Sequence, residues 1–234
     1  MSQPGDRLVI AIDGPAASGK SSTAKAVAAE LGYRHLDSGA FYRAVTLAAL
    51  ELGIPPDDWP ELDADRLAAF DVRAIPSEEG YRMAIRGEDV TERIRTSVVN
   101  EHVSAMAAIP AVRDWLLDSL REAGAEGGLV ADGRDIGTVV FPDAELKIFV
   151  ICEPEERARR RLRQDGLVTD EAAMQAEVVR LRERDRMDET RSAAPLVQAP
   201  DAVVLDTTSL DFATQVRKIA TLARQRPPRQ RPSA

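Results

Sequence analysis

The stretch Gly14-Pro15-Ala16-Ala17-Ser18-Gly19-Lys20-Ser21 decides the fold of this 234-residue chain. It matches G-x-x-x-x-G-K-[ST], the phosphate-binding loop or P-loop, whose glycines let successive backbone N–H groups point at a phosphate. The short apolar stretch 8–12 before it is typical of a buried strand, and residues 20–31 after it have helical periodicity ending at Gly32. Strand, loop and helix therefore follow in the order that the motif requires.

This loop predicts a site for ATP and Mg²⁺, the two cofactors that we expect. Lys20 supplies a positive charge for the β- and γ-phosphates, and the Ser21 hydroxyl is the expected metal ligand. The helix that follows adds its positive N-terminal end. The expected ATP-binding residues are Gly14, Pro15, Ala16, Ala17, Ser18, Gly19, Lys20, Ser21 and Ser22.

A P-loop by itself does not separate a kinase from a switch GTPase or a motor ATPase. A GTPase carries a base-binding N-K-x-D segment, and the sequence has none. A motor ATPase usually has an apolar strand that ends in paired acids, whereas 129–131 is followed by Asp132-Gly133-Arg134-Asp135. Both comparisons favour a kinase.

The remaining pattern predicts an α/β protein with one interruption. Alternating segments at 70–75 and 81–85, separated by a Pro- and Gly-containing turn, predict a β-hairpin, which fits poorly inside a β-α-β series and indicates an insert. Further strands are expected at 34–36, 128–131, 146–151 and 202–205, and helices at 40–52, 91–95, 97–108, 111–123, 154–163, 170–187 and 210–224. We expect a core with a parallel sheet flanked by helices at 8–64 and 111–224, an insert with a small β element at 65–110, and a tail without fixed structure at 225–234.

Composition excludes several classes of function. Lys and Arg number 31 against 39 Asp and Glu, a net charge of −8, which argues against a nucleic-acid or anionic-membrane partner. The single cysteine, Cys152, with two isolated histidines, His35 and His102, offers no metal-ligand cluster. The N-terminal residues carry no signal or membrane-spanning pattern. We therefore expect a cytoplasmic protein.

The cations are 27 arginines and four lysines, and position decides whether this reflects genome composition or chemistry. The segments 37–39 and 132–135 both follow predicted strands, so in a parallel sheet they face the same crevice as the P-loop. Arg43 and Ser38 then lie beside a second ligand. In the simpler alternative, Asp37 only caps a helix and Arg43 is solvated.

A second group of arginines lies between residues 157 and 191, with ten arginines, no lysine and eight acids. Arg157, Arg160 and Arg161 share one helix face, although surface ion pairs explain others, such as Arg159 and Arg180. Guanidinium groups screen the repulsion when a phosphoryl group is transferred to another phosphate, and an ionised phosphate needs no general base. A hydroxyl acceptor would need one, for which Asp37 or Asp135 is available.

Over residues 8–224 the sequence resembles the bacterial cytidylate kinases of the nucleoside monophosphate kinase group. The motifs that carry the resemblance are 12–21, 36–40 with Tyr42-Arg43, 87–90, 94–95, 131–142, 184–191 and 194–196. The resemblance implies an acceptor-binding insert, a short helical lid at about 157–168, and transfer of phosphate from MgATP to CMP or dCMP by a monomer.

The resemblance also implies residue roles. Ser104, Arg113 and Asp135 would bind the cytosine ring, and Ser38, Arg184 and Asp188 the sugar. Arg43, Arg134 and Arg191 would bind the acceptor phosphate. The whole substrate set is Ser38, Tyr42, Arg43, Ser104, Arg113, Asp132, Arg134, Asp135, Arg184, Asp188 and Arg191, and the catalytic set is Lys20, Arg134, Arg157, Arg160, Arg161 and Arg191. Two alternatives stay open: a P-loop kinase of a small hydroxylated metabolite, and a non-catalytic ATP-binding module.

Overall fold

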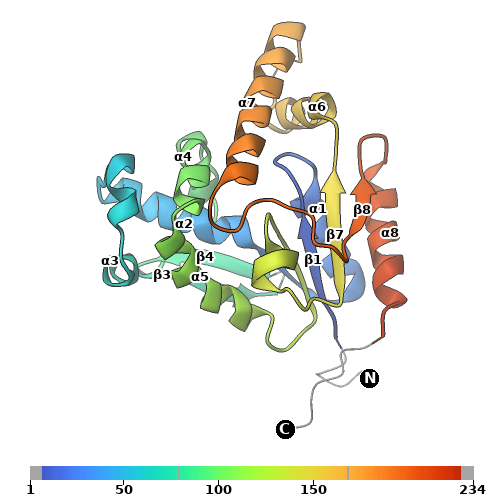
Figure 1. The fold of residues 1–234 in the computed structure, drawn as a ribbon, viewed down its shortest axis with the longest axis horizontal. Coiled ribbons are helices and arrows are strands. Elements are labelled where there is room, and N and C mark those ends of the chain that lie inside the picture. Colours follow the sequence, from blue (N-terminus) through green and yellow to red (C-terminus); the bar gives the residue numbers. More distant parts are fainter. Residues whose placement is uncertain (1–6, 79, 168, 228–234) are drawn as a thin grey trace.

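The computed structural model describes residues 7–78, 80–167 and 169–227, and it is built around a five-stranded parallel sheet (Figure 1). The strand order is β2-β6-β1-β7-β8. The strands are β1 (Val9–Asp13), β2 (Arg34–Asp37), β6 (Leu129–Gly133), β7 (Leu146–Ile151) and β8 (Val203–Asp206). All four pairings are parallel, and Asp37 is in register with Asp132 on the neighbouring strand. The predicted α/β class is confirmed.

Helices cover both faces of this sheet because successive side chains of a buried strand point to opposite faces. On one face Ile10, Ile12 and Val130 pack against α1 (Lys20–Leu31) and α8 (Phe212–Arg224). On the other, Val9 and Leu36 join a larger core with α2 (Ser38–Glu51) and α5 (Pro110–Ala123). The first strand-loop-helix unit matches the prediction closely.

Residues 65–110 contain the predicted hairpin as an antiparallel sheet in the order β3-β4-β5. Its strands are β3 (Val72–Ser77), β4 (Gly80–Ile85) and β5 (Glu88–Asp89), and the sheet is followed by α4 (Ser97–Ala107). The helix expected at 91–95 is a single 3₁₀ turn, η2 (Arg93–Arg95), because it holds too few residues for an α-helical turn to propagate. The buried side chains of this region join those of α2 and α5 in one core, and the proposed domain boundaries stay a prediction.

Three further short elements were not predicted. They are the 3₁₀ helix η1 (Pro56–Glu61), the helix α3 (Ala64–Ala69) and a π-helical turn, η3 (Ile136–Val140). Each is only five or six residues long, too short for periodicity to be read from sequence. All three contribute buried side chains to the larger core.

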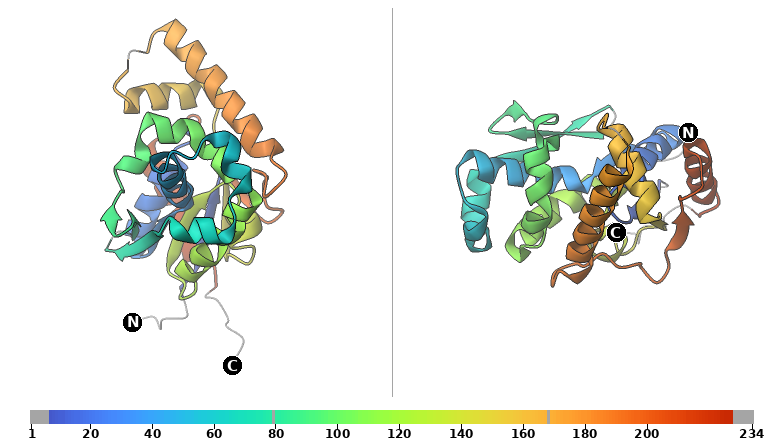
Figure 2. Two further views of the ribbon diagram at one scale, coloured as in Figure 1. Left: turned by 90° about the vertical axis from the view of Figure 1, so that its left-hand side faces the viewer. Right: turned by 90° about the horizontal axis from the view of Figure 1, so that it is seen from above.

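Two helices stand above the carboxyl ends of the sheet strands (Figures 1 and 2). They are α6 (Pro154–Gln164), which holds most of the segment expected to form the lid, and α7 (Glu171–Thr190), which follows that segment. Leu181 of α7 and Ala158 of α6 pack against Ala16 of the P-loop. Val168 of the expected lid and residues 228–234 of the expected tail lie outside the described residues. None of the described helices is both long and apolar enough to cross a membrane.

Candidate active site

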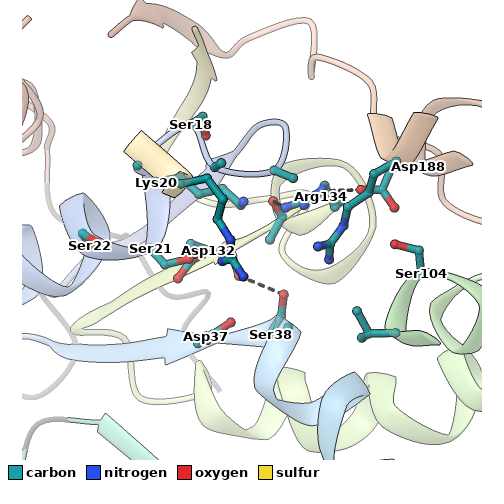
Figure 3. Close-up of a pocket in the computed structure, with 18 of the residues that line it drawn as sticks. Ser18, Lys20, Ser21, Ser22, Asp37, Ser38, Ser104, Asp132, Arg134 and Asp188 are labelled. Carbon is teal, nitrogen blue, oxygen red and sulfur yellow. Dashed lines mark hydrogen bonds and ion pairs between the residues drawn. The ribbon is translucent and has the colours of Figure 1, made fainter. Parts of the chain in front are cut away.

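A cavity of about 600 Å³ opens at the carboxyl edge of the sheet. It is lined by the P-loop, the ends of β2 and β6, and residues of α4, α5, α6, α7 and α8. Figure 3 shows Lys20, Ser21 and Asp132 on one side of it and Arg134, Asp188 and Ser104 on the other. Of the residues that the sequence singled out, all but Gly14, Pro15 and Arg157 line this cavity.

The P-loop owes its shape to two glycines with positive φ. At Gly14 φ is 156°, and a Cβ there would stand 2.5 Å from the Val150 carbonyl oxygen. At Gly19, the residue before α1, φ is 87°. Only glycine adopts both conformations at no steric cost, so the backbone wraps tightly around the space in front of α1.

Lys20 lies inside this wrap. Its Nζ donates to the Pro15 carbonyl oxygen at 3.2 Å, and the residue is 7% exposed. Burial, helped by the nearby Arg134 guanidinium, lowers the pKa of Lys20 to about 7. The nearby carboxylates of Asp132 and Asp37 raise this pKa and offset the lowering only in part. A phosphate bound next to Lys20 would raise the pKa further and keep the ammonium charged.

Ser21 and Asp132 together form an oxygen donor set beside the loop. The Ser21 hydroxyl donates to one carboxylate oxygen of Asp132, a residue only 1% exposed, and His35 Nε2 lies 2.7 Å from the other. Hydroxyl and carboxylate oxygens are the ligands that Mg²⁺ prefers. The sequence analysis placed Asp132 among the substrate-binding residues and not among the metal ligands. The sequence signal for a metal ligand was an acid at the end of the apolar strand β6.

The opposite wall of the cavity is rich in arginine. Arg134 Nε lies 2.7 Å from Asp188 Oδ2, so these predicted phosphate and sugar residues contact each other. Burial raises the pKa of Asp188, but Arg134 and Arg184 outweigh it and hold the pKa below its usual range. Burial and Arg134 lower the pKa of Arg184 to about 10, and its Nε has no hydrogen-bond partner among the described residues. Arg184 is thus a half-buried cation whose charge the nearby Asp188 carboxylate offsets only in part.

The predicted ring-binding residues come together at the base of α5. Arg113 forms a buried ion pair with Asp135, and its guanidinium lies 5.3 Å from the centre of the Tyr42 ring. Arg191 Nη2 lies 3.6 Å from the same Asp135 carboxylate. Ser104 of α4 lines the cavity beside them. The set offers a carboxylate, a guanidinium and an aromatic ring in one hollow.

Arg43 is held by a network that reaches into the insert. Its Nε donates to Asn100 Oδ1 at 3.2 Å, Asn100 Nδ2 donates to the Arg95 carbonyl oxygen at 3.0 Å, and Arg95 lies 2.9 Å from Asp37 Oδ2. Burial raises the pKa of Asp37, but Arg43 and Arg95 outweigh it, so the pKa lies below its usual value. Asp37 precedes α2 without a side-chain capping bond, so the capping alternative finds no support. Asn100 and Arg95 had no assigned role.

Ser38, the first residue of α2, is nearly buried. Its hydroxyl donates to the Asp132 carbonyl oxygen at 2.8 Å. The oxygen still has lone pairs free to accept from a ligand hydroxyl. The structure thus joins the ends of β2 and β6 through a residue expected to meet the sugar.

The three arginines expected in the lid separate into two groups. Arg160 and Arg161 line the cavity, and Arg160 also bonds to Ser18 O at 3.3 Å. Arg157, 4% exposed, instead donates to the Ala16 carbonyl oxygen at 3.0 Å and lies 2.6 Å from Asp185 Oδ2. The ion pair with Asp185 holds Arg157 against the loop backbone, and Arg157 does not line the cavity.

The end of the cavity beside α8 has an apolar lining that sequence reasoning missed. Leu210, Phe212 and Gln215 lie there with Arg160. Phe212 is 52% exposed, so its ring is accessible to a ligand in the cavity. The available signal was position, because these residues follow β8, whose carboxyl end faces the same crevice.

The comparisons with known proteins agree with this geometry. The family model described as cytidylate kinase matches residues 10–225. A cytidylate kinase from Chlorobaculum tepidum is 46% identical over 218 residues, covering 92% of each chain. A bifunctional pantoate ligase/cytidylate kinase from Synechococcus elongatus is 48% identical over 230 residues, and the match covers 95% of this chain but 43% of that longer protein. A solved, uncharacterized protein from Eubacterium ventriosum, 11% identical, shares the fold with a TM-score of 0.54 over 94% of this chain and 99% of its own.

Proposed function

The chain belongs to the cytidylate kinase family, and on that premise we propose that it transfers the γ-phosphoryl group of MgATP to CMP or dCMP, giving ADP and CDP or dCDP. The observation that carries the proposal is the single cavity that joins the P-loop to an arginine-rich hollow. Two polyanionic nucleotides must meet end to end for this reaction. The cavity offers cations to both.

The transfer is an in-line displacement. An oxygen of the acceptor phosphate forms a bond to the γ-phosphorus as the bond from that phosphorus to the β–γ bridging oxygen breaks. Charge develops on the equatorial oxygens, where Lys20 and the guanidinium groups of Arg134, Arg160, Arg161 and Arg191 stabilise it. An acceptor phosphate is mostly ionised at pH 7, so no protein base is needed.

The donor set fits Mg²⁺, with the Ser21 hydroxyl and the Asp132 carboxylate as the residues that would hold it. When bound, the ion neutralises charge on the donor phosphates. Groups of three or more His, Cys, Asp or Glu side chains that could form a metal cage are absent from the part of the chain that the structure describes. With only two protein oxygens in the donor set, the nucleotide phosphates would supply other ligands of the metal.

The acceptor assignments follow the roles that the resemblance implies, and the contacts of the arginine-rich part of the cavity support them. Asp135, held by Arg113 and Arg191, accepts from the cytosine amino group, and Arg113 and Ser104 donate to the acceptor edge. Arg184 and Asp188 bind the sugar with Ser38. Arg43, Arg134 and Arg191 bind the phosphate. Donor adenine packs against Leu210 and Phe212 at the other end of the cavity.

Kinases of small hydroxylated metabolites are disfavoured by the same contacts. Their acceptor hydroxyl needs a general base, and the two available carboxylates are ion-paired, Asp37 with Arg95 and Asp135 with Arg113. A carboxylate with a lowered pKa, such as Asp37, is a weaker base still. A non-catalytic ATP-binding module would not need the acceptor hollow. The expectation of a cytoplasmic monomer stays a prediction.

A coupled ADP-release assay over a panel of nucleoside monophosphates and small alcohols tests this function. CMP and dCMP are expected to give turnover, UMP less, and the alcohols none. Turnover with an alcohol but not with CMP would show that the protein is a kinase of a small hydroxylated metabolite. Tight ATP binding with no turnover on any acceptor would leave only a binding module.

Nucleotide binding is expected to take up a proton near neutral pH. Burial lowers the pKa of Lys20 to about 7, so above pH 7 the free ammonium is largely deprotonated, and a bound phosphate raises that pKa again. At pH 8 we expect the protein to take up nearly one proton for each MgADP that binds. The affinity for MgADP should therefore fall as the pH rises above 7. Calorimetry in buffers of different ionisation enthalpy measures the uptake, which should vanish in Lys20→Met.

A further inference from the structure

His35 lies next to Asp132, the carboxylate that we assign to the metal. His35 is on β2, one strand over from Asp132 on β6, and in this pairing it stands opposite Val130. Because side chains alternate along a strand, Val130 and Asp132 point to the same face of the sheet, and His35 shares that face. A diagonal contact across the two strands results, with His35 Nε2 at 2.7 Å from Asp132 Oδ1.

The proton in this contact belongs to the ring. An ionised carboxylate only accepts hydrogen bonds, so His35 Nε2 carries a hydrogen whether the imidazole is neutral or charged. The other oxygen of Asp132 accepts from the Ser21 hydroxyl. Each oxygen therefore has one donor, and the carboxylate cannot rotate about its Cβ–Cγ bond without losing both bonds.

We propose that His35 is a positioning residue that fixes the Asp132 carboxylate for the metal beside Ser21. The inference rests on the proposed function, because it takes Ser21 and Asp132 as the metal site. Side chains that orient metal-binding carboxylates commonly account for 10- to 100-fold in metal affinity. The His35 side chain is 13% exposed, so water replaces its N–H poorly when it is removed.

His35 also borders a second cavity, of about 660 Å³, which reaches Ser21 and Ser22 from the side of the β-hairpin. The ring is thus part of the wall between this cavity and the metal site. A substitution that tests the N–H must keep the wall filled. Leucine and glutamine both do so, and only glutamine keeps an N–H donor.

The test measures ADP affinity by calorimetry with Mg²⁺ and with a chelator, for the full chain and its variants. In His35→Leu we expect the gain in affinity from Mg²⁺ to fall about 10-fold, while metal-free ADP affinity stays within about 2-fold. His35→Gln should recover most of the gain. His102→Leu is the matched control, since His102 on α4 bonds within its own helix, to the Val98 carbonyl oxygen, and should keep the wild-type gain.

An unchanged Mg²⁺ gain in His35→Leu overturns the proposal, as does a His35→Gln variant that behaves like His35→Leu. If His35 had a purely structural role, His35→Leu would weaken ADP binding equally with and without Mg²⁺. That result would also contradict the proposal. If His35→Leu does not fold, His35→Met provides the apolar variant. Failure of wild-type turnover with CMP would overturn the proposed function, but the ADP titrations would still report on His35.

Discussion

Replacing Lys20 with methionine is expected to lower kcat for phosphoryl transfer roughly 10³-fold, because a fixed cation at the transferring group contributes about that much. Methionine keeps most of the length of the side chain and removes its charge. Lys20 lies inside the P-loop and lines the cavity, so no mobile cation from solvent replaces it well. The loss should appear in kcat more than in KM for CMP, since the acceptor residues lie across the cavity.

The same substitution should leave the fold intact. A buried ammonium whose pKa is lowered to about 7 is destabilised in the folded state, so at pH 7 its removal should leave the melting temperature unchanged or raise it. Lys218 is exposed on the outer side of α8, so Lys218→Met is the matched control and should keep kcat within about 2-fold. Activity of Lys20→Met within 10-fold of wild type, measured in the ADP-release assay, contradicts the assigned role.

Local signals were sufficient to predict the first unit of the fold. The helix after the P-loop begins at Lys20 and ends before Gly32, which has φ of 66°, as the sequence indicated. The π-helical turn Ile136–Val140 had no such signal. It is held from a distance by Asp13, whose two carboxylate oxygens accept from Ile136 N at 2.8 Å and Gly137 N at 2.7 Å. A turn that depends on a carboxylate more than a hundred residues away cannot be read from its own residues.

The candidate site was predictable where topology alone places residues. Parallel strands bring Asp37 and Asp132 to one edge, so the sequence placed both next to the P-loop. The distinction between Arg157 and Arg160 was not predictable, because both lie on one face of α6. It depends on Asp185 of α7, which draws Arg157 to the loop backbone. Partners brought together by tertiary packing decide such roles.

The arginine excess has two sources in this structure. Arg224 and Arg159 form surface ion pairs with Glu30 and Glu156, contacts that need no ligand to explain them. Arg184 instead is half-buried in the cavity near Arg134, with its pKa lowered to about 10. Neighbouring guanidinium groups cost folding free energy, and a perturbed pKa in a cavity is typical of a site that binds a ligand of opposite charge. The net charge of −8 describes the surface, and the cavity is locally positive.

Asp135→Asn is expected to reduce the preference for CMP over UMP roughly 5- to 150-fold, which corresponds to about 1–3 kcal/mol for one buried hydrogen bond to a base. Cytosine carries an amino donor at N4, where uracil carries an oxygen. The Asp135 carboxylate accepts from the first and repels the second. Asparagine has nearly the same volume but offers both a donor and an acceptor, so it tolerates either base.

The ratio of kcat/KM for CMP to that for UMP is the measurement that isolates this effect. Asp135 pairs with Arg113 in a buried site, and breaking such a pair costs about 3–5 kcal/mol of stability, so absolute rates will fall for reasons unrelated to the base. A loss of active protein cancels in the ratio. Asp201→Asn, which breaks the ion pair with Lys147, is the control and should leave the ratio unchanged. The carboxylate is the group whose interaction changes from attraction to repulsion between cytosine and uracil, so its removal must change the ratio if Asp135 selects the base. An unchanged ratio in Asp135→Asn would contradict that role and leave base selection to Arg113 and Ser104.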